Sequence, residues 1–228
     1  MTELILLTII LTAILRTIRK LRPGALPRLA NLGLRTPLRN RFFGPARVLK
    51  EAGIQPGWSV LELGPGWGFL THEAAREVGP DGQLVGLDMC PRMLEKCRVK
   101  VQDPSHALHL VCGNGEALPF KEACFDAALL VSVLGEVQDC PAMFREMLRC
   151  LKPGAAVLVN ELVLDPDYVF PWTVRRLGAG AGFEVGETTG NLLSHTTRLV
   201  KPQVELGIPA AYADELAQAA APTGEARL

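Results

Sequence analysis

Residues 59–68 read SVLELGPGWG, an apolar run of strand length that leads directly into a glycine-rich loop. A helix pattern follows through Val78, so this stretch predicts a strand, a tight loop and a helix in that order. Gly64, Gly66 and Gly68 allow the backbone to turn sharply and to approach a ligand closely. The order is that of the first unit of a doubly wound α/β sheet, with the loop at the carboxyl end of its strand.

The same alternation of strand and helix continues along the chain. We expect helices at Pro45–Ala52, Pro91–Gln102, Ala142–Leu151 and Val174–Ala181, and strands at Gln83–Leu87, His109–Cys112, Phe125–Val131 and Ala155–Asn160. Phe125–Val131 is nearly all apolar, as a parallel strand buried on both faces should be. Pro153 and Gly154 are expected to end the helix that precedes the last of these strands.

Two late strands close the pattern. Phe183–Thr188 and Thr196–Val200 are expected to be joined by a short loop that contains Gly190 and Asn191. Such a finish indicates one antiparallel strand in a mostly parallel sheet. The predicted fold is therefore an α/β, Rossmann-like, doubly wound and mostly parallel seven-stranded sheet with a C-terminal antiparallel hairpin.

Polar residues follow the ends of the predicted strands, where ligands bind in such sheets. Asp88, 24 residues after Gly64, is placed to accept hydrogen bonds from ribose hydroxyls. Asn114 can offer both a donor and an acceptor to an adenine edge. Ser132 and Glu161 are expected at the same edge, and Glu62 could hold a nearby cation or ammonium group there. Together with the glycine loop, these residues point to a nucleotide-like ligand.

At this point the sequence resembles the class I S-adenosylmethionine-dependent methyltransferases. It is most similar to their small, single-domain "type 11" branch, which includes quinone-biosynthesis methyltransferases. The resemblance covers about residues 44–202. It rests on VLELGPGWG (60–68), GLDMCPRML (86–94), GNGEALPF (113–120), FDAALLVSVLGEV (125–137), LRCLKPGAAVLVNE (148–161) and AGFEVGETTGN (181–191).

The resemblance implies an enzyme with S-adenosyl-L-methionine as its cofactor. By analogy Glu62 would hold the methionine amino group, Asp88 the ribose, and Asn114 with Gly115 the adenine. The implied cofactor contacts are Glu62, Gly64, Gly66, Gly68, Asp88, Met89, Asn114, Gly115 and Ser132. Asn114 departs from the Asp that is common in the family, but its amide oxygen can still accept a hydrogen bond. The residues Leu134-Gly135-Glu136 stand where members of this branch commonly have a His-containing tip after the fourth strand. This motif therefore does not indicate the methyl acceptor.

Transfer of a methyl group from a sulfonium is an in-line displacement, for which orientation of the reactants can supply much of the catalysis. A base is needed only if the acceptor enters protonated. The candidates for that base are Glu136, Glu161 and His195. Each also has a non-catalytic interpretation: Glu136 as a solvated acid in a loop, Glu161 as a hydrogen-bonding residue at a strand end, and His195 as a surface residue of the hairpin. Tyr168, Phe170 and Trp172 follow the fifth strand, where a segment that covers the substrate is expected; packing roles are an alternative.

The charge of the chain is unevenly distributed although its formal net charge is zero. Residues 1–50 contain ten basic residues and one acid, a net charge of +9, and the rest carries −9. Leu4–Leu15 (LILLTIILTAIL) is uncharged, and basic residues follow it, which by the positive-inside rule leaves the body of the protein cytoplasmic. We expect residues 1–22 to form an apolar membrane-anchor helix with a basic collar. The anchor either spans the membrane or lies on it; the alternative is an N-terminal helix that is buried against the domain or in a dimer.

The remaining divisions follow from composition. Residues 23–43 are expected to be a basic linker, residues 44–202 the methyltransferase domain, and residues 203–228 a flexible or helical tail. Aromatic residues are scarce in the basic segment, so a lipid surface fits it better than nucleic acid does. The six cysteines show no metal-ligand spacing, so we expect reduced, buried thiols and no metal site.

Several functions remain open at this stage. The sequence favours a membrane-associated methyltransferase that acts on a small lipophilic or lipid-like acceptor. A methyltransferase for a soluble small molecule or a protein, and a non-catalytic S-adenosylmethionine-binding interaction protein, are alternatives. A dinucleotide oxidoreductase is disfavoured because Phe69 stands where that fingerprint requires its third glycine. The oligomeric state is unknown.

Overall fold

The computed structural model describes residues 45–101, 107–163, 165, 167–191 and 194–203. The expected anchor helix at residues 1–22, the basic linker at 23–43 and nearly all of the expected tail lie outside the described residues. The described residues therefore correspond to the predicted methyltransferase domain, which carries the predicted site.

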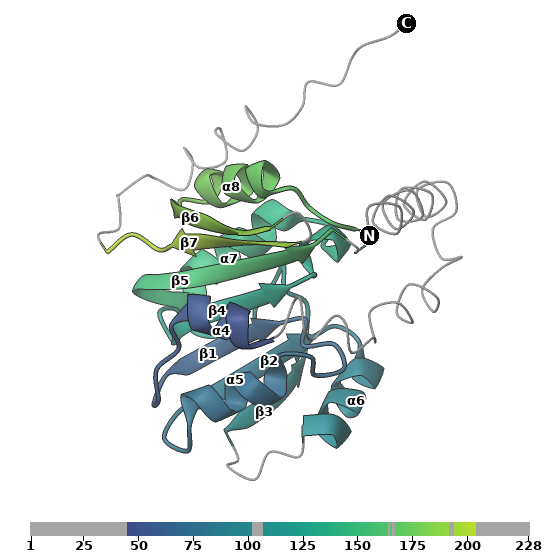
Figure 1. The fold of residues 1–228 in the computed structure, drawn as a ribbon. Coiled ribbons are helices and arrows are strands. Elements are labelled where there is room, and N and C mark those ends of the chain that lie inside the picture. Colours follow the sequence, from purple (N-terminus) through teal and green to yellow (C-terminus); the bar gives the residue numbers. More distant parts are fainter. Residues whose placement is uncertain (1–44, 102–106, 164, 166, 192–193, 204–228) are drawn as a thin grey trace, which may run out of the picture.

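Seven strands form one sheet in the order β3-β2-β1-β4-β5-β7-β6 (Figure 1). β1 to β5 are parallel to their neighbours, whereas β7 is antiparallel to both β5 and β6, as the sequence predicts. The strands are β1 (Ser59–Leu63), β2 (Gln83–Asp88), β3 (Leu108–Cys112), β4 (Phe125–Val131), β5 (Leu151–Leu162), β6 (Glu184–Asn191) and β7 (Ser194–Val200).

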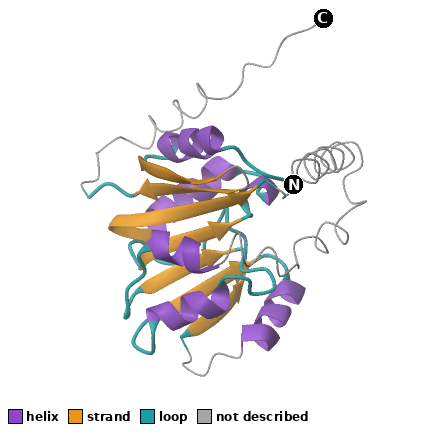
Figure 2. Cartoon of the chain, in the orientation of Figure 1, coloured by secondary structure: helices purple, strands orange, loops and turns teal. Residues whose placement is uncertain are grey.

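Helices cover both faces of this sheet (Figure 2). They are α4 (Pro45–Ala52), α5 (Thr71–Val78), α6 (Pro91–Val101), α7 (Cys140–Cys150), α8 (Pro171–Gly180) and the short 3-10 helix η1 (Leu134–Glu136). The side chains of β1 alternate between two cores. Val60 packs in the cluster that contains α4 and α5 residues, whereas Leu61 and Leu63 pack in the cluster that contains α7 residues. Both faces of β1 are therefore dry, which explains its apolar sequence.

The largest departure from the sequence prediction is at the start of β5. This strand begins at Leu151, immediately after α7, so Pro153 and Gly154 lie inside the strand and do not end the helix. Leu151 pairs with Phe125, and the register with β4 is irregular between Phe125 and Ala127. Such an irregularity accommodates a proline, which has no N–H for the ladder.

Helix α7 begins two residues earlier than predicted because Asp139 caps it. The Asp139 carboxylate accepts a hydrogen bond from the Ala142 amide at 2.9 Å, and proline lies in the first turn of the helix. Both features favour a helix start at this point. At the hairpin, β6 extends through Gly190 and Asn191, which were expected to lie in the loop.

The cysteines are less buried than expected. Only Cys97 and Cys150 are buried; Cys90, Cys124 and Cys140 are half-buried, and Cys112 is exposed. Cys112 is exposed because it ends β3, an edge strand of the sheet. All six are free thiols in this structure.

Phe144 tests the packing of α7 on the sheet. Its side chain is completely buried, and its ring meets that of Phe183 edge-on, with centroids 6.1 Å apart. We expect Phe144→Ala to lower the free energy of unfolding by about 3–5 kcal/mol, the usual cost of deleting a buried aromatic ring. Denaturant titration measures this change as a shift in midpoint. Val99→Ala on the exposed side of α6 is the control and should change stability by less than about 0.5 kcal/mol; equal effects would contradict the described core.

Candidate functional site

A cavity of about 410 Å³ lies at the carboxyl ends of the parallel strands. Its walls come from the segments that follow β1, β2, β3 and β4, together with Asp165 beyond β5. Eight of the predicted cofactor residues line it: Glu62, Gly64, Gly66, Asp88, Met89, Asn114, Gly115 and Ser132. Gly68 does not line it, so the structure brings together all but one of these residues.

The glycine loop needs its glycines for two separate reasons. Gly64 has a φ of 69°, and a Cβ at this position would lie 2.5 Å from the Val133 side chain. Gly66 has a φ of 55°, which other residues adopt only with strain, and its amide donates to Asp88 Oδ2 at 3.2 Å. Gly68 is outside the cavity lining and faces α6, where an added Cβ would lie 3.0 Å from the Val101 side chain; its carbonyl oxygen accepts a hydrogen bond from Lys100 Nζ at 2.7 Å.

Asp88 ends β2 and ties the glycine loop to the neighbouring strand. Its Oδ2 atom accepts from the Gly66 amide, and its Oδ1 atom accepts from the Cys90 amide at 2.8 Å. A carboxylate has about four acceptor positions. Asp88 can therefore keep both backbone bonds and still accept from the hydroxyls of a ligand.

Glu62 brings a buried carboxyl group to the cavity. The side chain is 3% exposed, and its Oε2 atom has no hydrogen-bond partner within the described residues. Burial raises the pKa of Glu62 from 4.5 to about 7, against the opposing effect of a hydrogen bond with Thr71. A buried, half-satisfied carboxyl of this kind is stabilised as a carboxylate by a cationic ligand.

Ser132 is the second unsatisfied group in the cavity wall. It has a φ of 54°, unusual for a residue other than glycine, and its buried hydroxyl has no hydrogen-bond partner within the described residues. The Ser132 amide donates to Asn160 O at 2.8 Å, which fixes the turn after β4. Strained backbone of this kind occurs often at ligand sites.

The loop after β3 is held in place by Glu116. Asn114 Oδ1 accepts from the Glu116 amide at 3.0 Å, and Glu116 Oε1 accepts from the amides of Gln138 and Asp139 at 3.1 and 2.9 Å. The amide oxygen of Asn114 thus has one lone pair in use and one for a ligand. Glu116 was not singled out from the sequence, although it stands two residues after Asn114 in the quoted motif.

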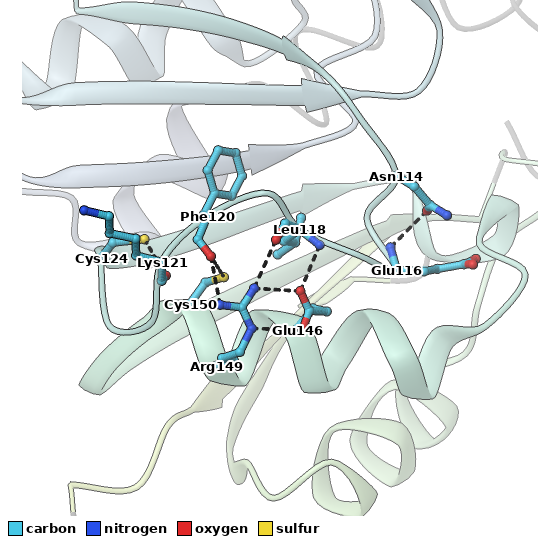
Figure 3. A network of polar contacts seen from close by, with 9 residues as sticks. All are labelled: Asn114, Glu116, Leu118, Phe120, Lys121, Cys124, Glu146, Arg149 and Cys150. Atoms are coloured by element: carbon cyan, nitrogen blue, oxygen red, sulfur yellow. Dashed lines mark hydrogen bonds and ion pairs between the residues drawn. The ribbon is translucent and has the colours of Figure 1, made fainter.

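A second anchor holds the continuation of this loop against α7 (Figure 3). Arg149 forms an ion pair with Glu146 at 2.7 Å and donates to the carbonyl oxygens of Phe120 and Leu118 at 2.8 and 3.0 Å. Glu146 Oε2 in turn accepts from the Leu118 amide at 2.9 Å. The hydrogen bond from Arg149 lowers the pKa of Glu146, so this anchor remains charged at neutral pH.

Glu136 lies apart from the other two candidate bases. Glu136 lines the cavity, whereas Glu161 and His195 are not part of its lining. His195 is 6% exposed and not a surface residue as one interpretation of the sequence had it, because β7 lies between β5 and β6. The pKa of His195 is lowered by burial.

Glu161 and His195 form a buried polar pair next to the cavity wall. They are directly opposite one another in the β5–β7 ladder. Glu161 Oε2 accepts from the Val169 amide at 3.3 Å, and His195 Nε2 lies 2.9 Å from the Val169 carbonyl oxygen. Burial raises the pKa of Glu161 to about 8. This arrangement holds the segment after β5 in place, and the catalytic role of either residue stays a prediction.

Several lining residues were not chosen from the sequence. They are mostly neighbours of the predicted ones: Trp67, Phe69, Cys90, Met93, Gln138 and Asp165. Lys100 Nζ lies 3.8 Å from the centre of the Trp67 ring, a cation–π contact. The glycine spacing was the signal that placed the loop, but it gave no role to the aromatic residues within and beside it.

Two structural features are absent from the described residues. Within them, no group of three or more His, Cys, Asp or Glu side chains is arranged to hold a metal ion. None of their helices is long and apolar enough to cross a membrane.

Comparison with known proteins gives the site a family context. Residues 61–159 match the type 11 family described as a methyltransferase domain. The chain is 33% identical to a demethylmenaquinone methyltransferase of Lactococcus lactis, an alignment that covers 51% of this chain and 46% of that protein. It is 39% identical to a ubiquinone/menaquinone biosynthesis C-methyltransferase of Shewanella woodyi, over 50% of this chain and 46% of that protein. The chain thus spans about half the length of these curated relatives.

The solved structures agree on the fold. A SAM-dependent methyltransferase from Aquifex aeolicus superposes with a TM-score of 0.68, at 22% identity, over 74% of this chain and 95% of that one. At this identity the likeness shows the fold alone, a Rossmann-like mixed sheet of the methyltransferase type.

Glu62 makes stability depend on pH. The native state holds a proton on Glu62 up to a pKa of about 7, whereas the ordinary value is 4.5. The native state therefore binds more protons than the unfolded state in this window, so Glu62 makes stability fall as pH rises from about 4.5 to 7. A pKa difference of this size corresponds to a loss of about 3 kcal/mol in the free energy of unfolding across this pH range. We expect Glu62→Gln, whose side chain does not ionise, to lack this loss. Denaturant titrations of both proteins at several pH values measure it, and parallel pH profiles would contradict the buried environment of Glu62.

Proposed function

We propose, from the premise that residues 61–159 form a type 11 methyltransferase domain, that the protein is an S-adenosylmethionine-dependent methyltransferase acting on a small, lipophilic, quinone-like acceptor. The observation that carries the proposal is the unsatisfied Glu62 carboxyl in a cavity bordered by the glycine loop and Asp88. The alternatives of a soluble or protein substrate, or of binding without catalysis, have no specific observation in their favour.

The residues present fit S-adenosylmethionine. Glu62 would hold the ammonium group, because a buried carboxyl without a second partner is stabilised by a positive charge. Asp88 would hold the ribose, and Asn114 with Gly115 the adenine. The hydroxyl of Ser132 would face the methionine end. When bound, the cofactor supplies a methyl group on a positively charged sulfur.

The chain's own contribution is orientation and shielding. Glu62 would place a carboxylate beside the ammonium group and Asp88 would accept hydrogen bonds from the ribose hydroxyls, so that both ends of the cofactor are held in a fixed orientation. Leu63, Leu70, Leu87, Val133 and Val137 provide apolar wall that limits the access of water. If the acceptor carries a proton that must leave, Glu136 is the candidate base favoured by position, since it lines the cavity.

The nature of the acceptor is inferred from the relatives. The similar proteins are methyltransferases of demethylmenaquinone and of ubiquinone/menaquinone biosynthesis. A quinone-like ring with an apolar tail resides in a membrane, which agrees with the apolar run and basic collar of residues 1–22. We therefore propose a membrane-associated enzyme, anchored through residues 1–22, with its catalytic domain in the cytoplasm.

Cofactor binding is tested by calorimetry with S-adenosylmethionine. We expect Asp88→Ala to weaken binding by about 10-fold to 100-fold, the loss of one charge-assisted hydrogen bond or more. Asp81→Ala, in an exposed turn, is the matched control and should bind as the intact protein does. Absence of binding by the intact protein would overturn the proposed function.

The acceptor and the anchor are tested together with two forms of the chain. In an assay with S-adenosylmethionine labelled on its methyl group and a fractionated lipid extract, we expect the labelled product in a quinone-like fraction. Removal of residues 1–22 should move the protein from the membrane to the soluble fraction after a high-salt wash, with cofactor binding retained. Sedimentation of the truncated form with washed membranes would contradict the anchor. Label found only in protein or in water-soluble molecules would contradict the lipophilic acceptor.

A further inference from the structure

Two aromatic side chains stand exposed directly after the segment that follows β5. Phe170 is 43% exposed and Trp172 is 64% exposed. Their rings are stacked, with centroids 4.4 Å apart and an angle of 11° between the planes, and Tyr168 packs edge-on against Phe170 at 5.0 Å. The stack is thus an ordered, water-exposed apolar surface.

Basic residues share this side of α8. Arg175 and Arg176 lie three and four residues after Trp172, which puts the three on one face of the helix, and both arginines are exposed. Arg175 is held there by hydrogen bonds to Gly186 O and Thr188 Oγ1 at 3.1 and 3.3 Å. α8 contains no acidic residue. We call Phe170, Trp172, Arg175 and Arg176 the aromatic–arginine face.

The opposite side of α8 is fixed to the sheet. Val174 and Gly178 are its buried residues, and a Cβ on Gly178 would lie 2.6 Å from the Leu199 side chain of β7. The helix therefore cannot turn its aromatic residues inward without losing this packing. An outward face of Trp, Phe and Arg is the composition of a membrane interface, where rings sit at headgroup level and arginines meet anionic lipids.

Hydrogen bonds and a ring contact link the aromatic–arginine face to the cavity. Asp165 lines the cavity, and its carbonyl oxygen accepts from the Tyr168 amide at 3.1 Å. The Tyr168 ring packs on His195 with centroids 5.6 Å apart, and the Val169 amide donates to Glu161. In Figure 1 this segment runs from the end of β5 to the start of α8. A membrane that contacts Trp172 would therefore have a defined position relative to the cavity wall.

We propose that the aromatic–arginine face rests on an anionic lipid bilayer and thereby orients the cavity toward the membrane. The inference deepens the proposed function and rests on it, since orientation of this kind serves an acceptor that resides in the bilayer. The charge of the two arginines selects anionic headgroups. A single aromatic pair gives only reversible binding, so this contact orients the domain and does not replace the anchor.

The depth of Trp172 in the bilayer tests the proposal directly. The full chain has three tryptophans, and Trp172→Phe serves as the reference from which the emission of Trp172 is obtained by difference. With vesicles of phosphatidylcholine and phosphatidylglycerol carrying brominated acyl chains, we expect the Trp172 emission to shift to shorter wavelength and to be quenched. Equal quenching in the intact chain and in Trp172→Phe would overturn the proposal, because residues 1–22 would then account for all binding.

Charge is tested with a matched pair of variants. Arg176→Gln should weaken binding to phosphatidylglycerol vesicles about fivefold, the effect of one basic residue near an anionic surface. Arg98→Gln, exposed on α6 beside β3, should leave binding unchanged. Equal loss in the two variants would contradict the assigned face.

Two further outcomes separate this inference from the proposed function. If Trp172 already emits at short wavelength and is shielded from acrylamide without vesicles, another segment or a partner covers the face, and the proposal fails. If the protein binds S-adenosylmethionine but Trp172 is not quenched by brominated lipid, the orientation fails while the methyltransferase proposal stands.

Discussion

The parallel pairing of β1 with β2 on one side and with β4 on the other is the constraint on which the site depends. The order of the strands reverses at this point, so the connections leave β1 and β4 toward opposite faces and a crevice opens between them. β1 ends in that crevice and carries the Glu62 carboxyl and the glycine loop into it. Without this pairing, the Glu62 carboxyl and the glycine loop would not be brought together at the crevice.

The cavity walls are fixed by side chains that bond to distant backbone. Asp88 holds the Gly66 amide, Glu116 holds the start of α7, and the Glu146–Arg149 pair holds the loop after β3. Each contact joins segments about 20–30 residues apart. Such preformed walls lose little freedom when a ligand binds, so the ordering cost that would reduce affinity is small.

The sequence alone was sufficient to predict the strands that are short and apolar. β4 matches its predicted bounds, and β1 coincides with the apolar run before the glycine loop, because apolar runs between turn residues leave few alternatives. β7 was harder to predict. Its residues SHTTRLV are mainly polar, and they are buried only because β5 and β6 lie on either side. For this reason one interpretation placed His195 at the surface. The Asp139 cap is a local signal, three residues before Ala142, that the predicted start of this helix did not use. The Glu146–Arg149 anchor depends on the backbone of Leu118 and Phe120, distant partners that local pattern does not reveal.

We propose that the function of this site depends on the Glu62 carboxyl, which would receive the ammonium group of the cofactor. A crystal structure of the full chain with S-adenosylhomocysteine, which has the same amino-acid end, tests it most directly. We expect the ligand amino nitrogen within about 3 Å of a Glu62 carboxyl oxygen, with the ribose hydroxyls on Asp88. A ligand bound in the cavity with its amino group away from Glu62, or bound outside the cavity, would contradict this role of Glu62.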